Sequence, residues 1–162
     1  MPEITFRTAW RRDDAALIRD AKQFWRGLGL AMSEEEAGER ARELCAVAYE
    51  GNKLVAVSTA MPYIYPRLRS RFAFYRSMVA PEFRRQNLAS RLCVYSRDVL
   101  ANWSFAHPEE KLMGLLIVFE SDQFKGHRNA PIALQLGLQL YLVGYKIDDH
   151  IRVVWFNHAT VE

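Results

Sequence analysis

The sequence has little cysteine and histidine, and no apolar run that could cross a bilayer. It contains 2 cysteines and 4 histidines in 162 residues. The longest apolar run, residues 112–119, is far shorter than the roughly 20 residues of a membrane-spanning helix. No histidine has a second histidine or a cysteine at metal-ligand spacing, so we expect no metal site. Cys45 and Cys93 both lie in apolar, helix-like patterns, which favours two buried free thiols over a disulfide. Free thiols in turn favour a cytoplasmic location, where the environment is reducing.

The excess of positive charge is also small. Lysine and arginine number 22 against 19 acidic residues, for a net charge of +3. Such a balance allows an anionic ligand but does not require nucleic acid. Half of the residues are hydrophobic and 12% are aromatic, enough for a full core. The length predicts a single domain over residues 1–162, and residues 1–7 lack the apolar segment of a signal peptide.

The hydrophobic pattern predicts strands and helices in a mixed order. Asp13 or Asp14 can cap a first helix that ends near Gly27, and Ser33 with Glu36 forms the capping-box pattern of a second. The expected strands are 4–9, 46–49, 54–61, 72–79, 112–120, 139–147 and 151–161, and the expected helices are 14–28, 33–45, 88–105 and 129–138.

Glycine is absent from the connection between strand 72–79 and helix 88–105, where residues 79–89 are VAPEFRRQNLA. The dinucleotide fingerprint and the P-loop both need several glycines in such a turn, which excludes them. A strand, a short polar turn and a helix start still make an anion site, because the first helical N–H groups are unpaired and the helix dipole favours negative charge. Arg84 and Arg85 add donors suited to phosphate oxygens. The connection therefore predicts a phosphate or pyrophosphate site; the alternative is a basic connection without a ligand.

At these residues the sequence resembles the GCN5-related N-acetyltransferases, the GNAT superfamily. The family carries a Val-x-Pro-x-x-Arg/Gln-x-x-Gly-x-Gly/Ala segment between its fourth strand and third helix. Val79, Pro81, Arg84 and Ala89 match that segment in place. Asn87 stands where the family usually has glycine, and asparagine is the next most tolerant residue for a left-handed backbone. The expected order of elements resembles that of the family over nearly the whole chain.

The resemblance implies a fold of the α/β (α+β) class. It would have a mixed, mostly antiparallel central sheet of six to seven strands, flanked by about four helices. The sheet would be splayed between its fourth and fifth strands, here 72–79 and 112–120.

The resemblance also implies acetyl-CoA as the cosubstrate. In the family this loop holds the diphosphate of the coenzyme, and the preceding strand pairs with its pantetheine amides. The main chain of Met78 and Val79 would take the pantetheine role and polarise the thioester carbonyl. The diphosphate would lie on Arg84, Arg85, Gln86, Asn87, Leu88, Ala89 and Ser90.

The acid and base of the family are harder to place. Many members have a glutamate on the strand before the loop, where this sequence has Ala73, and a tyrosine near the end of a fourth helix, where alignment gives Ala133. Glu120, at the end of strand 112–120, is the remaining candidate for the base, although a solvated strand end is the alternative. Tyr141 or Tyr145 could replace the acid. Ordered water could also remove the proton.

The sequence therefore indicates an acetyl-CoA-dependent N-acetyltransferase that acts on a primary amine. The acceptor could be a small molecule, a peptide or an aminoacyl-tRNA, and a homodimer is compatible with the sequence. A non-catalytic acyl-CoA-binding module is the first alternative. A toxin-like acetyltransferase acting on aminoacyl-tRNA is the second, and it rests on a basic, aromatic stretch that contains Arg67, Arg69, Arg71 and Arg76.

Overall fold

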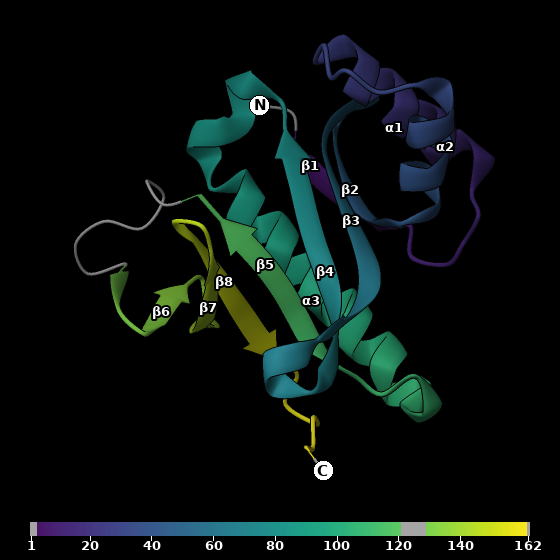
Figure 1. The fold of residues 1–162 in the computed structure, drawn as a ribbon. Helices are drawn as coiled ribbons and strands as arrows, with labels where there is room; N and C mark the ends of the chain where they lie inside the picture. Colours follow the sequence, from purple (N-terminus) through teal and green to yellow (C-terminus); the bar gives the residue numbers. More distant parts are fainter. Residues whose placement is uncertain (1–2, 121–128, 162) are drawn as a thin grey trace. The chain divides into compact units, whose positions relative to one another are not determined.

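A computed structural model describes residues 3–120 and 129–161. These residues form a mixed α+β fold, and hydrogen-bonded neighbours give the strand order β1-β2-β3-β4-β5-β8-β7-β6 (Figure 1). Strands β4 and β5 pair in parallel, whereas β1–β2, β2–β3, β5–β8, β6–β7 and β7–β8 are antiparallel. The strands are β1 (Ile4–Thr8), β2 (Leu44–Glu50), β3 (Lys53–Tyr65), β4 (Ser70–Val79), β5 (Leu112–Phe119), β6 (Ile132–Gln135), β7 (Leu138–Lys146) and β8 (Asp149–Trp155). The α-helices are α1 (Ala15–Gly27), α2 (Glu34–Arg42) and α3 (Leu88–Ala106), and short 3-10 turns are η1 (Pro66–Leu68), η2 (Pro81–Gln86) and η3 (Pro108–Glu110).

The predicted fold class is confirmed, with differences in the number of elements. The described residues contain eight strands and three α-helices, where six to seven strands and about four helices were expected. The chain divides into two compact units, Met1–Ala60 with Arg76–Val99 and Met61–Tyr75 with Leu100–Glu162. The single domain over residues 1–162 stays a prediction.

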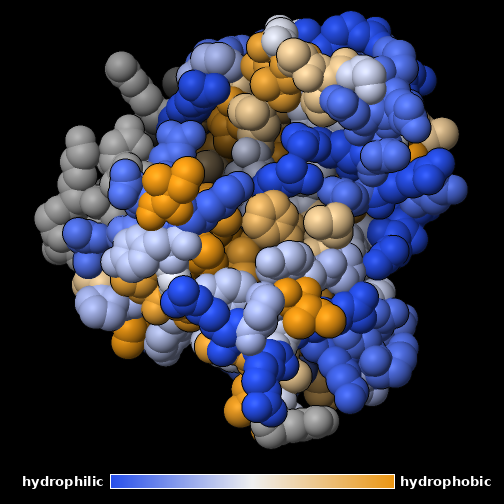
Figure 2. Space-filling model, in the orientation of Figure 1, coloured by the Kyte–Doolittle hydropathy of each residue, from blue (hydrophilic) through white to orange (hydrophobic). Residues whose placement is uncertain are grey.

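In the first unit, β2 is buried on both faces between helices. Its alternate side chains divide between two clusters, so that Val47 and Tyr49 pack with α1 while Ala46 and Ala48 pack with the start of α3. This double burial explains why β2 is a nearly continuous apolar run instead of an alternating one. In Figure 2 the outer edge of the region of α1 and α2 is mostly hydrophilic, with hydrophobic residues beside it.

The ends of α1 and α2 follow their capping residues. The Asp14 carboxylate accepts hydrogen bonds from the main-chain N–H groups of Ala16 (3.0 Å) and Leu17 (3.2 Å). Ser33 and Glu36 form both halves of the predicted capping box. Both helix starts are thus confirmed.

The second helix ends earlier than expected, at Arg42, and Cys45 lies in β2 instead of in a helix. The register of β2 against β3 shifts between Leu44 and Ala46, which makes Cys45 a bulge residue. Its carbonyl accepts the N–H groups of Ala9 (2.9 Å) and Trp10 (3.0 Å), where β1 ends. Tertiary hydrogen bonds therefore override the local helical pattern.

Both thiols are free and buried, as the sequence favoured. Burial raises the pKa of the Cys45 thiol to about 12, so this thiol is neutral near pH 7. Beside it, the hydroxyls of Ser58 and Ser96 are 2.8 Å apart, and the Ser58 hydroxyl also accepts the Ala46 N–H at 3.1 Å. This buried polar group fixes α3 against β2 and β3.

In the second unit, Phe72, Leu116 and Val153 form the centre of an apolar cluster on one face of β4, β5 and β8. Tyr65 joins this cluster, and its hydroxyl donates to the Val143 carbonyl at 3.3 Å. The phenol lies over Gly144, where an added Cβ would overlap the hydroxyl.

Arg152 on β8 is fully buried. Its guanidinium donates to the carbonyls of Ala130 and Leu140, both at 2.9 Å, and lies 3.1 Å from His150 Nδ1. Because a guanidinium can only donate, Nδ1 of His150 accepts and its proton lies on Nε2. Burial and the neighbouring Arg152 cation lower the pKa of His150, so this imidazole is neutral at pH 7.

The predicted helix over 129–138 is wrong, because this segment contains β6 and a hairpin turn. Leu136 and Gly137 both have positive φ, 47° and 83°, as the two-residue hairpin turns that fit the twist of a sheet require. Pro131 also cannot donate a main-chain hydrogen bond within a helix. A glycine at position 137 between two apolar segments therefore indicates a hairpin turn in this sequence.

We predict that Gly114→Ala destabilises the second unit. A Cβ at Gly114 would overlap the Val154 carbonyl oxygen across the β5–β8 pair, and that oxygen belongs to the backbone and cannot swing aside. The expected loss in the free energy of unfolding is about 1–3 kcal/mol, measured by urea denaturation. Gly38→Ala is the control, because a Cβ there meets only the end of a lysine side chain and alanine favours a helix by about 0.5–1 kcal/mol. Equal stability of the two variants would contradict the close approach.

Candidate functional site

The candidate site is the turn between β4 and α3, in the first unit. The Ala80 N–H donates to the Val55 carbonyl at 2.8 Å, which holds the start of the turn on β3. The buried Phe83 ring anchors its middle. At its end Asn87 has φ 53° and ψ 24°, in the left-handed region, and α3 begins at the next residue. Asparagine thus supplies the turn that glycine supplies in the family segment.

Arg84 lies across this turn toward the end of β4. Its Nε donates to the Val79 carbonyl at 3.3 Å, and the residue is exposed. A guanidinium has five N–H donors, of which this bond uses one. The remaining donors are therefore available to a ligand on the exposed side of the turn.

The other residues predicted to hold the diphosphate follow along the same turn. Gln86, Asn87 and Ala89 are exposed and Ser90 is half-buried. Leu88 is fully buried in the core, so only its main chain can face a ligand. The main chain of Arg85 lies in η2, whereas its side chain is outside the described part of the chain.

One acidic side chain lies within this turn. Glu82 is 3.1 Å from the Nζ of Lys53, at the start of β3. A hydrogen bond from its own backbone N–H and the contact with Lys53 lower the pKa of Glu82. Its charge near a phosphate site is thus offset by Lys53.

Met78 and Val79 end β4 directly before the turn. Met78 is half-buried and Val79 is buried with Ala80 in the core of the first unit. Earlier in the strand, the pairing of β4 with β5 runs from Arg71–Leu112 to Phe74–Leu116, with a register shift between Arg71 and Ala73.

The two candidate catalytic side chains are not brought together. Glu120 is exposed immediately after β5, whereas the register through Val153 places Tyr141 level with Leu116. Four residues of strand separate these levels, roughly 13 Å at about 3.3 Å per residue. The Tyr141 hydroxyl donates to the Gln139 side chain at 3.0 Å. An acid–base pair made of Glu120 and Tyr141 therefore does not fit the second unit.

The structure also locates the two alanines that the alignment set against the acid and base of the family. Ala73 is fully buried in β4, so a carboxylate would have no solvent there. Ala133 lies in β6 and not on a fourth helix. The alignment of Ala133 with a helical tyrosine was therefore wrong.

The basic stretch that suggested a nucleic-acid acceptor is partly engaged within the protein. Arg71 pairs with the Glu110 carboxylate at 2.7 Å and donates to its carbonyl at 2.9 Å. Arg76 pairs with Glu43 at 3.3 Å. Arg67 and Arg69 are exposed around η1. Two of the four arginines of this stretch thus form ion pairs within the protein.

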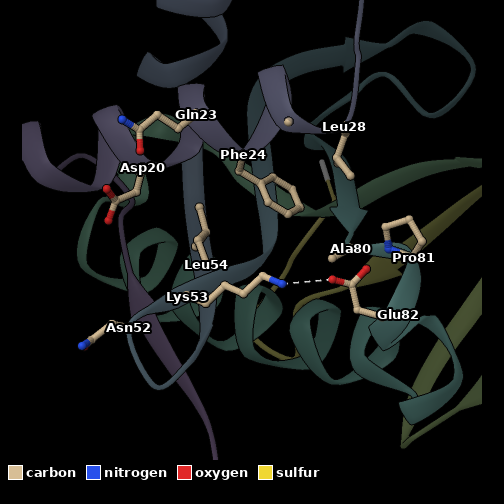
Figure 3. Close-up of a pocket in the computed structure, with 11 residues that line it drawn as sticks. Asp20, Gln23, Phe24, Leu28, Asn52, Lys53, Leu54, Ala80, Pro81 and Glu82 are labelled. Carbon is tan, nitrogen blue, oxygen red and sulfur yellow. Dashed lines mark hydrogen bonds and ion pairs between the residues drawn. The ribbon is translucent and has the colours of Figure 1, made fainter.

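Sequence reasoning missed a cavity of about 680 Å³ in the first unit. One wall is a stripe along α1, and the other is formed by the β2–β3 turn, the start of β3 and the first residues of the candidate loop (Figure 3). The stripe has the spacing i, i+3, i+4, i+7 and i+8, which places its five residues on one face of the helix, but only two of them, Phe24 and Leu28, are large and apolar. The lining residues are Asp20, Gln23, Phe24, Gly27, Leu28, Asn52, Lys53, Leu54, Ala80, Pro81 and Glu82.

In residues 3–120 and 129–161, no group of three or more histidine, cysteine, aspartate or glutamate side chains is placed to hold a metal ion. No helix in the same residues combines the length and the apolar character that crossing a membrane requires.

No protein-family model and no curated protein sequence matches this chain. Several solved structures do. The acetyltransferase of GNAT family from Streptococcus pneumoniae is 12% identical with a TM-score of 0.56, over 96% of this chain and 100% of its own. NAA60 of Arabidopsis thaliana, in complex with acetyl-CoA, is 14% identical with a TM-score of 0.54, over 96% and 99%. An aminoglycoside 6'-N-acetyltransferase complexed with coenzyme A is 12% identical with a TM-score of 0.58, over 97% and 99%.

The chain has the GNAT fold. The similarity covers nearly all of the chain, as the predicted order of elements implied. At such low identity the similarity concerns the fold alone, and the chemistry of the site depends on the residues that this chain places there.

We predict that Asn87→Val lowers the free energy of unfolding by about 1–2 kcal/mol, because a β-branched residue resists the left-handed conformation. Asn87→Gly should remain as stable as the wild type, since glycine adopts this conformation freely. Asn102→Val, on the exposed face of α3, is the control, because asparagine and valine have similar helix propensities. Urea denaturation of the four proteins measures the effect, and a fully stable Asn87→Val would show that the turn is not left-handed.

Proposed function

We propose that this protein is an acetyl-CoA-dependent N-acetyltransferase that transfers an acetyl group directly to a primary amine of its acceptor. The observation that carries the proposal is the left-handed turn at Asn87, which leads into α3 and follows an exposed Arg84 bonded to the Val79 carbonyl. Two of the similar structures support the coenzyme, since one holds acetyl-CoA and the other coenzyme A.

The residues of the turn fit a diphosphate. The N–H groups of the first turn of α3 have no partner within the helix, and the dipole of this 19-residue helix favours an anion at its start. Arg84 adds donors suited to phosphate oxygens. Met78 and Val79 would supply main-chain contacts to the pantetheine arm, and their N–H groups would polarise the thioester carbonyl.

Acetyl-CoA, when bound, supplies a thioester carbon that the acceptor amine can attack. A C–N bond forms, the C–S bond breaks, and the thiolate of coenzyme A leaves. The amine is protonated in neutral water, so one proton must be removed before attack and one must reach the leaving thiolate. Glu120 is the residue we assign to proton removal, because it is an exposed carboxylate at the end of β5. Proton delivery to the thiolate would fall to water.

A non-catalytic acyl-CoA-binding module is the second candidate. It is favoured by the positions of Glu120 and Tyr141, which are too far apart along the strands to act as a pair. Coenzyme binding without turnover across a panel of amines would support this candidate against the enzyme.

We predict that coenzyme A binds far more tightly than pantetheine, which lacks the diphosphate, when both are measured by calorimetry. Arg84→Gln should lower coenzyme A affinity about tenfold or more, since hydrogen bonds to charged groups contribute about 1.5–3 kcal/mol. The same substitution should leave pantetheine affinity unchanged. Arg67→Gln is the matched control, because Arg67 is exposed in η1, outside the first unit. Equal affinity for the two ligands would remove the diphosphate assignment.

We predict that Glu120→Gln lowers turnover by roughly 10²-fold, the lower part of the range for a general base, without changing coenzyme affinity. Initial rates with acetyl-CoA and an amine panel, measured against pH, provide the test. Glu109→Gln, on the exposed η3 turn, is the control for loss of an acidic surface charge. A loss below about threefold would reject Glu120 and leave proton removal by water.

A further inference from the structure

The cavity beside α1 does not include Arg84 among its lining residues, and the proposed acetyl transfer leaves it unused. It has the size of a small-molecule site, since such sites commonly measure about 300–1,000 Å³. All of its lining residues belong to the first unit. The Ala80–Val55 hydrogen bond fixes one wall, and the packing of Leu17, Ala21 and Trp25 fixes α1.

The middle of the cavity is apolar and its edges are polar. In Figure 3 the Phe24 ring points into the space between α1 and the loop, with Leu54 and Leu28 beside it. Lys53 and Glu82 form an ion pair along one edge, at 3.1 Å. Asp20 and Gln23 lie together on α1 at one end.

The charges of the lining leave an excess of one negative charge. Lys53 offsets Glu82, so Asp20 provides the excess. The Asp20 carboxylate accepts the Tyr49 hydroxyl at 2.7 Å, which fixes its orientation without neutralising it. Arg19 approaches it at 3.5 Å, but this pair is screened by solvent as strongly as Lys53–Glu82, and Arg19 is not among the lining residues. An anionic ligand such as a nucleotide would be repelled here, whereas a cation would be attracted.

We propose that this cavity binds a small organic cation, an ammonium group carried on an apolar, aromatic body. The ammonium lies at Asp20, with the Gln23 side-chain oxygen as a second acceptor. The aromatic body packs against Phe24, Leu28 and Leu54, where ring stacking and apolar burial both stabilise it.

Binding in the cavity is coupled to the loop that follows β4. Ala80, Pro81 and Glu82 form its wall, and Glu82 lies within the turn that ends at Asn87. A ligand that holds this wall changes the affinity of the loop for its own ligand, and the effect is reciprocal. This coupling rests on the proposed coenzyme site, whereas cation binding itself does not.

Three probes with the same aromatic body and different charge test the proposal: 2-phenylethylamine, 2-phenylethanol and 3-phenylpropionate. They are titrated into the protein without coenzyme, and binding is followed by two-dimensional amide NMR. We expect 2-phenylethylamine to bind in the millimolar range, at least fivefold more tightly than the alcohol, with 3-phenylpropionate the weakest. The shifted signals should include Gly27, Leu28 and Leu54.

Two variants locate the site. Asp20→Asn keeps an acceptor for the Tyr49 hydroxyl but removes the charge, and should weaken 2-phenylethylamine about tenfold while leaving the alcohol unchanged. Gly27→Phe should abolish binding, because nothing lies within 4 Å of a Cβ at Gly27 and a large side chain can enter the cavity. Gly38→Phe on α2 is the control for adding an aromatic side chain, and thermal denaturation confirms that each variant is folded.

Equal affinities for the amine and the alcohol, tighter binding of 3-phenylpropionate, or binding that survives in a folded Gly27→Phe would each overturn the proposal. The coupling is tested afterwards by repeating the coenzyme A titration with 2-phenylethylamine present. A changed coenzyme affinity in the wild type but not in Gly27→Phe supports it, and an unchanged affinity removes the coupling. Failure of coenzyme A to bind at all would count against the proposed function and not against the cation site.

Discussion

The candidate site depends on one residue that holds a left-handed backbone conformation where the chain has no glycine. Asn87 reverses the direction of the chain between η2 and α3, so that α3 begins directly after the turn that follows β4. Two other contacts keep this turn in place, the Ala80–Val55 hydrogen bond before it and the burial of Leu88 after it. The turn therefore brings Arg84 and the first N–H groups of α3 within a few residues of one another in the chain.

Much of this arrangement could be predicted from the sequence because its determinants are local. The Asp14 cap, the Ser33–Glu36 capping box and the conformational tolerance of Asn87 depend on residues within a few positions of one another. The features that the sequence did not reveal depend on contacts distant in the chain. Cys45 lies in an apolar pattern that suits a helix, but its carbonyl accepts two hydrogen bonds from the end of β1 and the residue becomes a bulge. The buried Arg152 likewise depends on carbonyls from two other segments, and nothing in the local pattern indicates it.

The placement of Glu120 and Tyr141 bears directly on the chemistry. Glu120 was selected from the sequence as a carboxylate at a strand end, and Tyr141 as a replacement for the missing family tyrosine. The strand registers place the two residues at different levels. Tyr141 also donates its hydroxyl to Gln139, so a role in proton transfer would first require that bond to break. Glu120 is exposed just after β5. Under the proposed function, main-chain groups would therefore position the reactants, and one carboxylate or water would move the proton.

The negative lining of the cavity and the positive character of the loop are consistent with two different ligands. Arg84 and the start of α3 favour an anion on one side of the turn, while Asp20 gives the cavity an excess of negative charge. Glu82 lies between them, and its pairing with Lys53 prevents it from opposing the anion. A single ion pair thus separates two regions of opposite charge across the same short segment of chain. The proposed cation lies at Asp20, at the other end of the cavity from this ion pair, so Glu82 stays paired with Lys53 when the cavity is occupied. The wall that Ala80, Pro81 and Glu82 share with the loop, and not a competition for Glu82, is therefore the physical route by which one site would affect the other.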